Sequence, residues 1–489
     1  MLHTLILNLL VAQGLMGAFD TIWHHEIRCA LPQHTSAGPE LRLHAIRALL
    51  YGVLFAGLAW FAWGHLWLIG LWSIIAIEIL LTLRDFVIED KTRSLPASER
   101  VTHTLLAING GVTFGLLAWH SQSWWALPTG LHWSPHGWQS VALSLWAIGV
   151  AASGVRDALA SRALAARSPN TRFDFRGGDP ARCAQSFLLT GGTGSIGQPL
   201  VRALLADGHR VTILARNPRV ASQLFDGRAA CVGSLNELDP ATRFDVIINL
   251  AGAPILGVRW SDARKRYLIA SRTQTTRSLL NWIAAADHRP RLMISASAVG
   301  YYGVQPEDSQ HNCTEDDAPQ DCFASQLCQQ WEATAKEAAA LNVPLAIMRL
   351  GIVLGHQGAL PALLMPIKLG CGGRLGSGNQ AQSWIHIDDV LGTIAWLCRR
   401  KLEPHADALA TYNLVAPEVP TQLSLTRTAA ALLHRPVWSR APAGLIGLML
   451  GEQSTILLDG ARVAPARLRQ QGYVFRFPTL RGALENLLG

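Results

Sequence analysis

The chain is 489 residues long, 49% of them hydrophobic and 16% charged, with a formal net charge of +8. This length exceeds what one hydrophobic core supports, so we expect at least two domains. The positive charge lies on scattered arginines without a lysine-rich block, which argues against nucleic-acid binding. The eight cysteines form no C-x-x-C pair, so we expect reduced thiols rather than a zinc module or a disulfide scaffold.

The first third of the chain contains long apolar runs, at about 3–19, 47–64, 66–83, 103–119 and 138–155. Each is roughly as long as a helix that crosses about 30 Å of hydrocarbon, although the first is marginal. The first run has no basic start and no clear small-residue cleavage site, so we do not expect a removed signal peptide. The sequence predicts an all-α membrane bundle of about five helices over 1–158. Buried helices of a globular domain are the alternative.

The arginines predict how these helices are oriented. The connection after the third run carries Arg84, Lys91, Arg93 and Arg100, whereas 121–137 contains no lysine, arginine or acid. Because basic connections stay in the cytoplasm, the N-terminus is expected outside and the chain after about 156 inside. We therefore predict a multi-pass protein of a bacterial-type inner membrane with a cytoplasmic C-terminal domain.

Carboxylates and histidines recur four residues apart in this third, first at Asp20 and His24 and then twice more. Residues i and i+4 share a helix face, so each pair can present a carboxylate beside an imidazole. Such pairs on facing helices suit a di-iron type of metal site. A polar pocket for a membrane-soluble substrate, or plain helix caps and ion pairs, are the alternatives. The candidate metal ligands are Glu40, His44, Glu99 and His103.

A glycine-rich turn follows a polar segment over 159–185, which we interpret as a linker. An apolar run enters Thr190-Gly-Gly-Thr-Gly-Ser-Ile-Gly197 and an apolar-periodic segment leaves it. This is the strand, tight turn and helix start of a dinucleotide site, where glycine permits the turn, close approach of the pyrophosphate and tight helix packing. The phosphates would lie at the helix N-terminus. The candidate cofactor-binding residues here are Gly191, Gly194, Ser195, Ile196 and Gly197.

The next apolar strand ends at Arg216, which offers a cation to a 2′-phosphate where an acid would accept a ribose hydroxyl. We therefore favour NADP as the cofactor, with NAD as the alternative. A further strand ends in Asn249, Ala251 and Gly252, which should lie against the cofactor. The alternation of strands and helices predicts an α/β Rossmann domain with a doubly wound parallel sheet over 186–415. A small C-terminal substrate lobe is expected over 416–489.

Several motifs in order carry a family resemblance: Thr190–Gly197, Asn249–Gly252, Ser295–Gly303 and Trp384–Val390. They resemble the extended short-chain dehydrogenase/reductase superfamily, in particular its atypical, epimerase-like subgroup with a small C-terminal extra region. The resemblance covers about 186–489 and does not extend to the membrane domain. It implies a Rossmann fold, a nicotinamide cofactor and a site of serine or threonine, tyrosine and lysine.

The Tyr-x-x-x-Lys pair that the family implies is missing, because Ala324 and Cys328 take its positions. The atypical subgroup also tends to lack the pair, which favours a variant site. A serine could hydrogen-bond a substrate carbonyl, and one of two adjacent tyrosines could supply the proton. Glu332 is either a further catalytic candidate or an ordinary residue of a helix surface. The candidate catalytic residues are Ser297, Tyr301, Tyr302 and Glu332.

Three hypotheses for the function follow. The first is a membrane-anchored NADP-dependent oxidoreductase or epimerase that acts on a lipophilic or small carbonyl or hydroxyl substrate at the cytoplasmic face. The second is a non-catalytic NADP-binding sensor or scaffold, which the missing tyrosine and lysine favour. The third is a composite with a metal site in the membrane domain. We expect a small-molecule or lipid-like partner and the membrane, and leave the oligomeric state open.

Overall fold

The computed structural model describes residues 2–28, 38–92, 97–166, 173–175, 184–401 and 409–488. The chain forms two compact units, Met1–Asn170 and Thr171–Gly489. Helix α5 (Trp138–Ala166) covers the first part of the linker predicted over 159–185, and residues 167–172 and 176–183 of that linker lie outside the described residues. Phe175 is fully buried in the core of the second unit.

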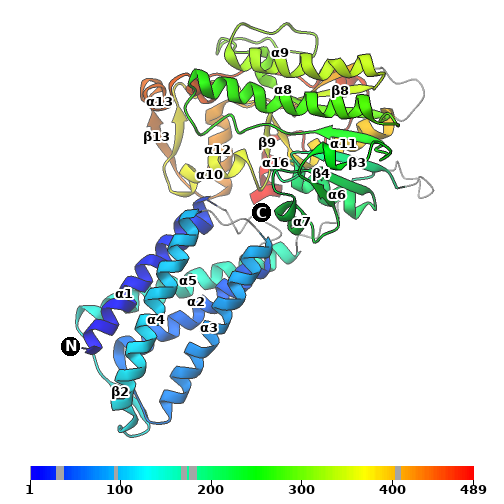
Figure 1. Ribbon diagram of the computed structural model, residues 1–489. Coiled ribbons are helices and arrows are strands. Elements are labelled where there is room, and N and C mark those ends of the chain that lie inside the picture. The colour runs from blue at the N-terminus through cyan, green and yellow to red at the C-terminus, as the bar shows by residue number, and fades with distance from the viewer. Residues whose placement is uncertain are drawn as a thin grey trace. The chain divides into compact units, whose positions relative to one another are not determined.

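The first unit is helical, as predicted, and each apolar run corresponds to one helix, except that the last four residues of 47–64 form a short strand (Figure 1). A short antiparallel pair of strands, β1 and β2, joins the ends of two of these helices. The elements are α1 (Leu2–Phe19), its π-helical continuation η1 (Asp20–Arg28), α2 (Gly38–Trp60), β1 (Phe61–Gly64), α3 (Trp67–Thr92), α4 (Ala97–Trp125), β2 (Gly130–Trp133) and α5.

Consecutive helices alternate in direction. The rings of His3, at the start of α1, and His136, just before α5, are 4.2 Å apart, so α1 and α5 begin at the same end. Ser161 near the end of α5 donates to the carbonyl of Gly38 at the start of α2. The β1–β2 pair brings the ends of α2 and α4 together. Successive helices therefore run between the two ends of the unit in opposite directions, which is the arrangement that five crossings would require.

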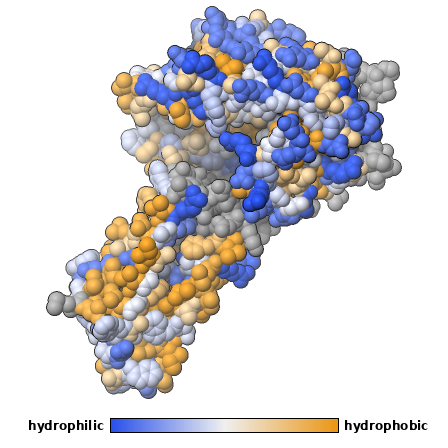
Figure 2. Space-filling view, viewed as in Figure 1, coloured by the Kyte–Doolittle hydropathy of each residue, from blue (hydrophilic) through white to orange (hydrophobic). Residues whose placement is uncertain are grey.

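The helical unit exposes apolar side chains and buries polar ones. Figure 2 shows hydrophobic residues over the visible surface of these helices, and Trp119, Ile148 and Leu80 are 72%, 69% and 66% exposed. Within the described residues, four helical segments are long and apolar enough to cross a membrane: Leu2–His25, Glu40–Trp60, Ser98–Trp125 and Trp138–Arg162. The crossing predicted over 66–83, which lies in α3, stays a prediction.

The second unit contains the predicted doubly wound parallel sheet. Seven described strands hydrogen-bond in the order β12-β8-β7-β6-β3-β4-β5, and all neighbours are parallel. The order reverses at β3, which is buried along its whole length because helices cover both faces. The strands are β3 (Ser186–Thr190), β4 (Arg210–Leu214), β5 (Ala230–Val232), β6 (Val246–Asn249), β7 (Leu292–Ala298), β8 (Leu345–Leu350) and β12 (Leu409–Leu414).

Alternate side chains of β3 enter two cores. Leu189 packs with residues of α6 (Gly197–Ala206) and α11 (Ile387–Lys401) on one face. Leu188 packs with residues of α8 (Asp262–Ala285) on the other face, where α8 and α9 (Phe323–Lys336) run side by side (Figure 1). The period of two along the strand thus explains why both faces are covered.

A smaller lobe includes most of the predicted segment 416–489 together with an earlier part of the chain. Strand β13 pairs in parallel with β10, and this pairing brings α10 and β10 into the lobe. The main elements are α10 (Ala359–Lys368), β10 (Gly372–Leu375), α12 (Gln422–Leu432), β13 (Val437–Ala441), α13 (Ala443–Leu450) and α16 (Leu480–Leu488).

Candidate functional site

The glycine turn joins β3 to α6 as the sequence predicted. Gly191 has φ of +71°, a conformation that favours glycine. A Cβ on Gly197 would lie 2.1 Å from the Gly191 carbonyl oxygen, so the helix can only start this close to the turn without a side chain. The Gly194 N–H donates to the same carbonyl at 3.0 Å. The three spaced glycines therefore hold one tight turn.

The N-terminus of α6 is left without a side-chain cap. Ile196 occupies the N-cap position and makes no side-chain capping bond. The N–H groups of the first helical turn and the helix dipole together favour an anion at this position. Ser195 is exposed beside it, 3.1 Å from the position of a Cβ on Gly358. The segment before α10 therefore lies over the turn.

The strand ends beside the turn are tied together by hydrogen bonds. The Thr190 hydroxyl donates to Asn249 Oδ1 at 2.7 Å and accepts the Ala251 N–H at 3.3 Å, and Asn249 donates to the Thr276 hydroxyl at 2.9 Å. Asn249 is fully buried, so its side chain positions this edge. Backbone at Ala251 and Gly252 therefore lies next to the glycine turn, as expected. Arg216 is exposed just after β4, the neighbour of β3.

Sequence reasoning missed Arg272, a buried cation on α8. Its guanidinium donates to the carbonyls of Leu268 and Ala253 and stacks over Trp331 at 5.1 Å. It also lies 3.1 Å from the position of a Cβ on Gly252. Burial lowers the pKa of Arg272, but a guanidinium stays charged. The sequence signal that could have indicated its burial is its place on the buried face of α8, where the residues at i−4 and i+4 are also buried.

Three of the four candidate catalytic residues lie in one buried network. The Ser297 hydroxyl donates to Glu332 Oε1 at 2.7 Å, and Arg349 makes two hydrogen bonds to the Glu332 carboxylate, at 2.8 and 2.9 Å. Arg349 also donates to the Tyr302 hydroxyl at 2.8 Å. Glu332 is 2% exposed, so the alternative of a helix-surface residue is wrong. The carboxylate is already fully engaged by a cation.

The two tyrosines differ in their surroundings. Tyr302 is 1% exposed and donates to Asn413 Oδ1 at 2.6 Å, and burial raises its pKa above the usual value. Tyr301 is partly exposed, and the Arg349 guanidinium lies 3.4 Å from the centre of its ring. A proton donor must reach substrate, so Tyr301 is the better placed of the pair. The catalytic roles of Ser297 and Tyr302 stay predictions.

The positions of the missing tyrosine and lysine lie against the turn after β7. Ala324 and Cys328 are the neighbours that a Cβ on Gly300 would meet, at 3.5 and 3.9 Å. Burial raises the pKa of Cys328 to about 12, so its thiol stays protonated at neutral pH. Arg272 lies near this thiol and supplies a cation where the lysine is absent.

The predicted metal ligands lie at one end of the helical unit, where side chains from other helices join the predicted pairs. His103 contacts Asp20 of η1 at 3.1 Å rather than presenting a site with Glu99 alone, and His44 contacts Asp85 of α3 at 3.2 Å. Within the described helices, the groups close enough to share an ion are Asp20, His25 and His103. Glu40 and Glu99 are both fully buried at this end.

The fold and the glycine turn define a dinucleotide-binding protein of the extended Rossmann type. A model of the NAD dependent epimerase/dehydratase family matches residues 187–414, and a domain of unknown function, DUF1731, matches 441–487. The chain belongs to the epimerase/dehydratase family, which confirms the resemblance drawn from the motifs. Neither family model extends into the helical unit.

Similar proteins match about 62% of this chain and nearly all of their own length. An epimerase family protein of Staphylococcus aureus is 34% identical over 307 residues, which are 62% of this chain and 99% of the relative. Epimerase family protein YfhF of Bacillus subtilis is 34% identical over 306 residues, 62% of this chain and 98% of the relative. The structure of human epimerase family protein SDR39U1 with NADPH is 31% identical, with a TM-score of 0.55, and matches 62% of this chain and 98% of that chain.

The turn geometry predicts the effect of Gly197→Ala. The new Cβ would overlap the Gly191 carbonyl, and overpacking of about 1–3 kcal/mol corresponds to a loss of roughly 5- to 150-fold in dinucleotide affinity. Isothermal titration with NADPH measures the change. Gly444→Ala, at a helical glycine with open space around it, is the matched control and should bind like the unchanged protein. Equal affinities for the two variants would contradict this account of the turn.

The buried ion pair predicts a second effect. Glu332→Gln leaves Arg349 as a poorly compensated buried cation, which should destabilise the second unit by about 3–5 kcal/mol. The lower unfolding temperature is measured by tryptophan fluorescence on the full chain. The double variant Glu332→Leu/Arg349→Met removes both charges and should recover part of the loss. A double variant less stable than the sum of its single changes would rule this out.

Proposed function

We propose that the protein is a membrane-anchored, NADP-dependent oxidoreductase or epimerase of a lipophilic or small carbonyl or hydroxyl compound at the cytoplasmic face. The observation that carries the proposal is the uncapped start of α6 beside the glycine turn, with Arg216 exposed after the adjacent strand. The turn accounts for the pyrophosphate and Arg216 for a 2′-phosphate. The human relative's structure with NADPH supports this choice over NAD.

The cofactor would supply the hydride, and the chain would bind it, orient the substrate and provide a proton. Tyr301 is our candidate donor, because its hydroxyl has no hydrogen-bond partner among the described residues and its ring faces the Arg349 guanidinium. The guanidinium lies over the face of the phenol ring, in the geometry of a cation–π contact. In this proposal Arg349 takes over the electrostatic part that lysine plays in the family's usual site.

The inverted surface of the helical unit supports membrane anchoring. Its outer side chains are apolar, whereas acids and histidines lie inside, the opposite of a soluble helical bundle. Four segments have the length and composition of membrane spans. The arginine distribution then assigns the second unit to the cytoplasm.

Apolar surface near the expected site supports a lipophilic substrate. Gln453, just after α13, donates to the carbonyls of Ile255 and Val258, so α13 lies beside the loop that follows β6. Val258 and, on α13, Leu448 are 64% and 74% exposed. An acyl or isoprenoid chain would cover such residues, which water otherwise contacts.

The choice of cofactor predicts the effect of Arg216→Glu. Loss of a charge-assisted hydrogen bond worth about 1.5–3 kcal/mol should weaken NADPH binding roughly 10- to 150-fold. NADH binding should stay within about threefold, because it has no 2′-phosphate. Titration calorimetry with both cofactors checks this. Arg228→Glu, at an exposed arginine beyond α7 (Pro218–Leu224), is the control, and a parallel loss of NADH affinity would contradict the assignment.

Turnover is tested by NADPH oxidation when a membrane lipid extract is added to the full chain in detergent. Tyr301→Phe should lower kcat by about 10²- to 10⁴-fold with NADPH affinity unchanged, because only the proton donor is lost. Tyr302→Phe should mainly lower stability, since its hydroxyl bonds are buried. If both variants kept full turnover, the role of Tyr301 would be wrong.

A sensor is the second candidate function. It is favoured by the engagement of Ser297 with Glu332 and by the absence of the Tyr-x-x-x-Lys pair. NADPH binding without oxidation or epimerisation across lipid and sugar classes would favour the sensor. Oxidation with any one class would favour the enzyme.

A further inference from the structure

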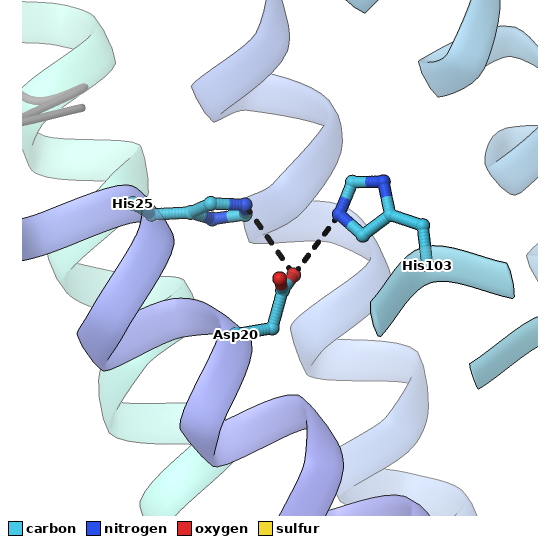
Figure 3. Close-up of side chains that lie close together, drawn as sticks. All are labelled: Asp20, His25 and His103. Atoms are coloured by element: carbon cyan, nitrogen blue, oxygen red, sulfur yellow. Dashed lines mark hydrogen bonds and ion pairs between the residues drawn. The ribbon is translucent and has the colours of Figure 1, made fainter. Parts of the chain in front are cut away.

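The polar end of the helical unit gathers acids and histidines from four helical segments. Asp20 and His25 lie on η1, His44 on α2, Asp85 on α3 and His103 on α4. These side chains are buried or nearly so, in a unit whose exterior is apolar. Figure 3 shows the carboxylate of Asp20 between the rings of His25 and His103, which reach it from two helices.

The distances within this group match those between ligands of one metal ion. Asp20 Oδ2 lies 3.1 Å from His103 Nε2 and 3.4 Å from His25 Nε2, and one ligand atom of each residue lies within 4.8 Å of the others. Donors about 2.1 Å from a tetrahedral ion are roughly 3.4 Å apart. Glu99 Oε1 adds a second carboxylate, 3.6 Å from His25 Nε2.

Contacts around the ligands hold their side chains in place. The rings of His25 and His44 stack in parallel, with centres 4.6 Å apart and an interplanar angle of 6°. Asp20 also accepts a hydrogen bond from His24 at 2.8 Å through its other oxygen, and His24 in turn contacts the Ser98 hydroxyl. Such outer hydrogen bonds orient metal ligands.

A second observation points into the same place. Among the described residues, His44 Nδ1 and Asp85 Oδ1 are buried without a hydrogen-bond partner, on side chains that are only 9% and 2% exposed. Leaving a buried polar atom unsatisfied costs about 1–3 kcal/mol, so two together favour a ligand. The His44 ring stacks on the His25 ring, and His44 Nε2 lies 3.2 Å from Asp85 Oδ2, so both side chains lie next to the Asp20 group.

We propose that Asp20, His25 and His103 bind a divalent first-row transition-metal ion, with Glu99 as a further ligand and His44 and Asp85 next to them. Two imidazole nitrogens with carboxylate oxygens are the donor set of iron(II), manganese(II) and zinc(II) sites. Of the four ligands predicted from the sequence, His103 and Glu99 belong to this set. Asp20 and His25 replace Glu40 and His44 as direct ligands, because contacts between helices, and not spacing along one helix, bring the donors together.

The test is elemental analysis of the full chain, purified in detergent with any affinity tag removed. After reconstitution with iron(II), manganese(II) or zinc(II) in separate arms and removal of excess metal, we expect about one ion per chain in at least one arm. Asp20→Asn and His103→Gln should each lower the bound metal by at least about 10-fold. His120→Gln is the matched control, because His120 is on the same helix α4 and near the opposite end, beside His3.

Folding of each variant is checked by gel filtration and by NADPH affinity, which the second unit supplies independently. If a variant fails to fold, cobalt(II) titration of the unchanged chain, followed by its visible absorption and competed with zinc(II), gives the answer instead. Stoichiometric, saturable binding supports the site. Metal below about one ion per ten chains in every arm, or metal retained by both Asp20→Asn and His103→Gln, overturns the proposal.

Discussion

The bidentate ion pair between Arg349 and Glu332 positions the side chains in one half of the carboxyl-terminal edge of the sheet. This is the half where we expect catalysis. Arg349 extends from β8 and Glu332 from α9, and both are almost fully buried. The pair holds the Ser297 hydroxyl through the carboxylate, the Tyr302 hydroxyl through the guanidinium, and the Tyr301 ring beneath the same cation. Buried charges persist only when paired and hydrogen-bonded, so the loss of one partner would disturb every neighbour.

The other half of the edge is built mainly from backbone groups, with Arg216 exposed just after β4. Glycines and backbone groups of the turn after β3 approach the end of β6, and a Cβ on Gly191 would lie 2.8 Å from the Leu250 carbonyl. This half binds a dinucleotide by shape and helix polarity. Arg272 lies between the halves, bound to the Ala253 carbonyl and close to Cys328. The edge therefore keeps two cations, Arg272 and Arg349, beside the place where the family's usual lysine is missing.

Local patterns in the sequence predicted most of the fold, and contacts between distant segments account for what they missed. The turn that ends at Gly197 could be predicted because its glycines lie close together in the chain. All of them are needed for the same reason, the tight packing of this turn. Helical spacing could not show that Glu332 is buried, since its partner Arg349 comes from a strand. In the helical unit, spacing grouped His44 with Glu40, and packing adds Asp85 of α3 as a neighbour that spacing could not show. Contacts between distant segments, and not local propensity, therefore determine which partners a buried charged side chain has.

The helical unit has more polar chemistry than anchoring requires. An anchor needs apolar helices that satisfy their own backbone hydrogen bonds, and Leu or Ala in the interior would meet that need. This unit instead buries Asp20, Glu40, Glu78, Asp85 and Glu99, each no more than 6% exposed, at or toward one end. Burying carboxylates costs free energy unless cations offset it, and Arg47 lies within ion-pair distance of Glu78 and Asp85. Three histidines lie within 3.4 Å of the Asp20 carboxylate, and the proposed metal site rests on this group.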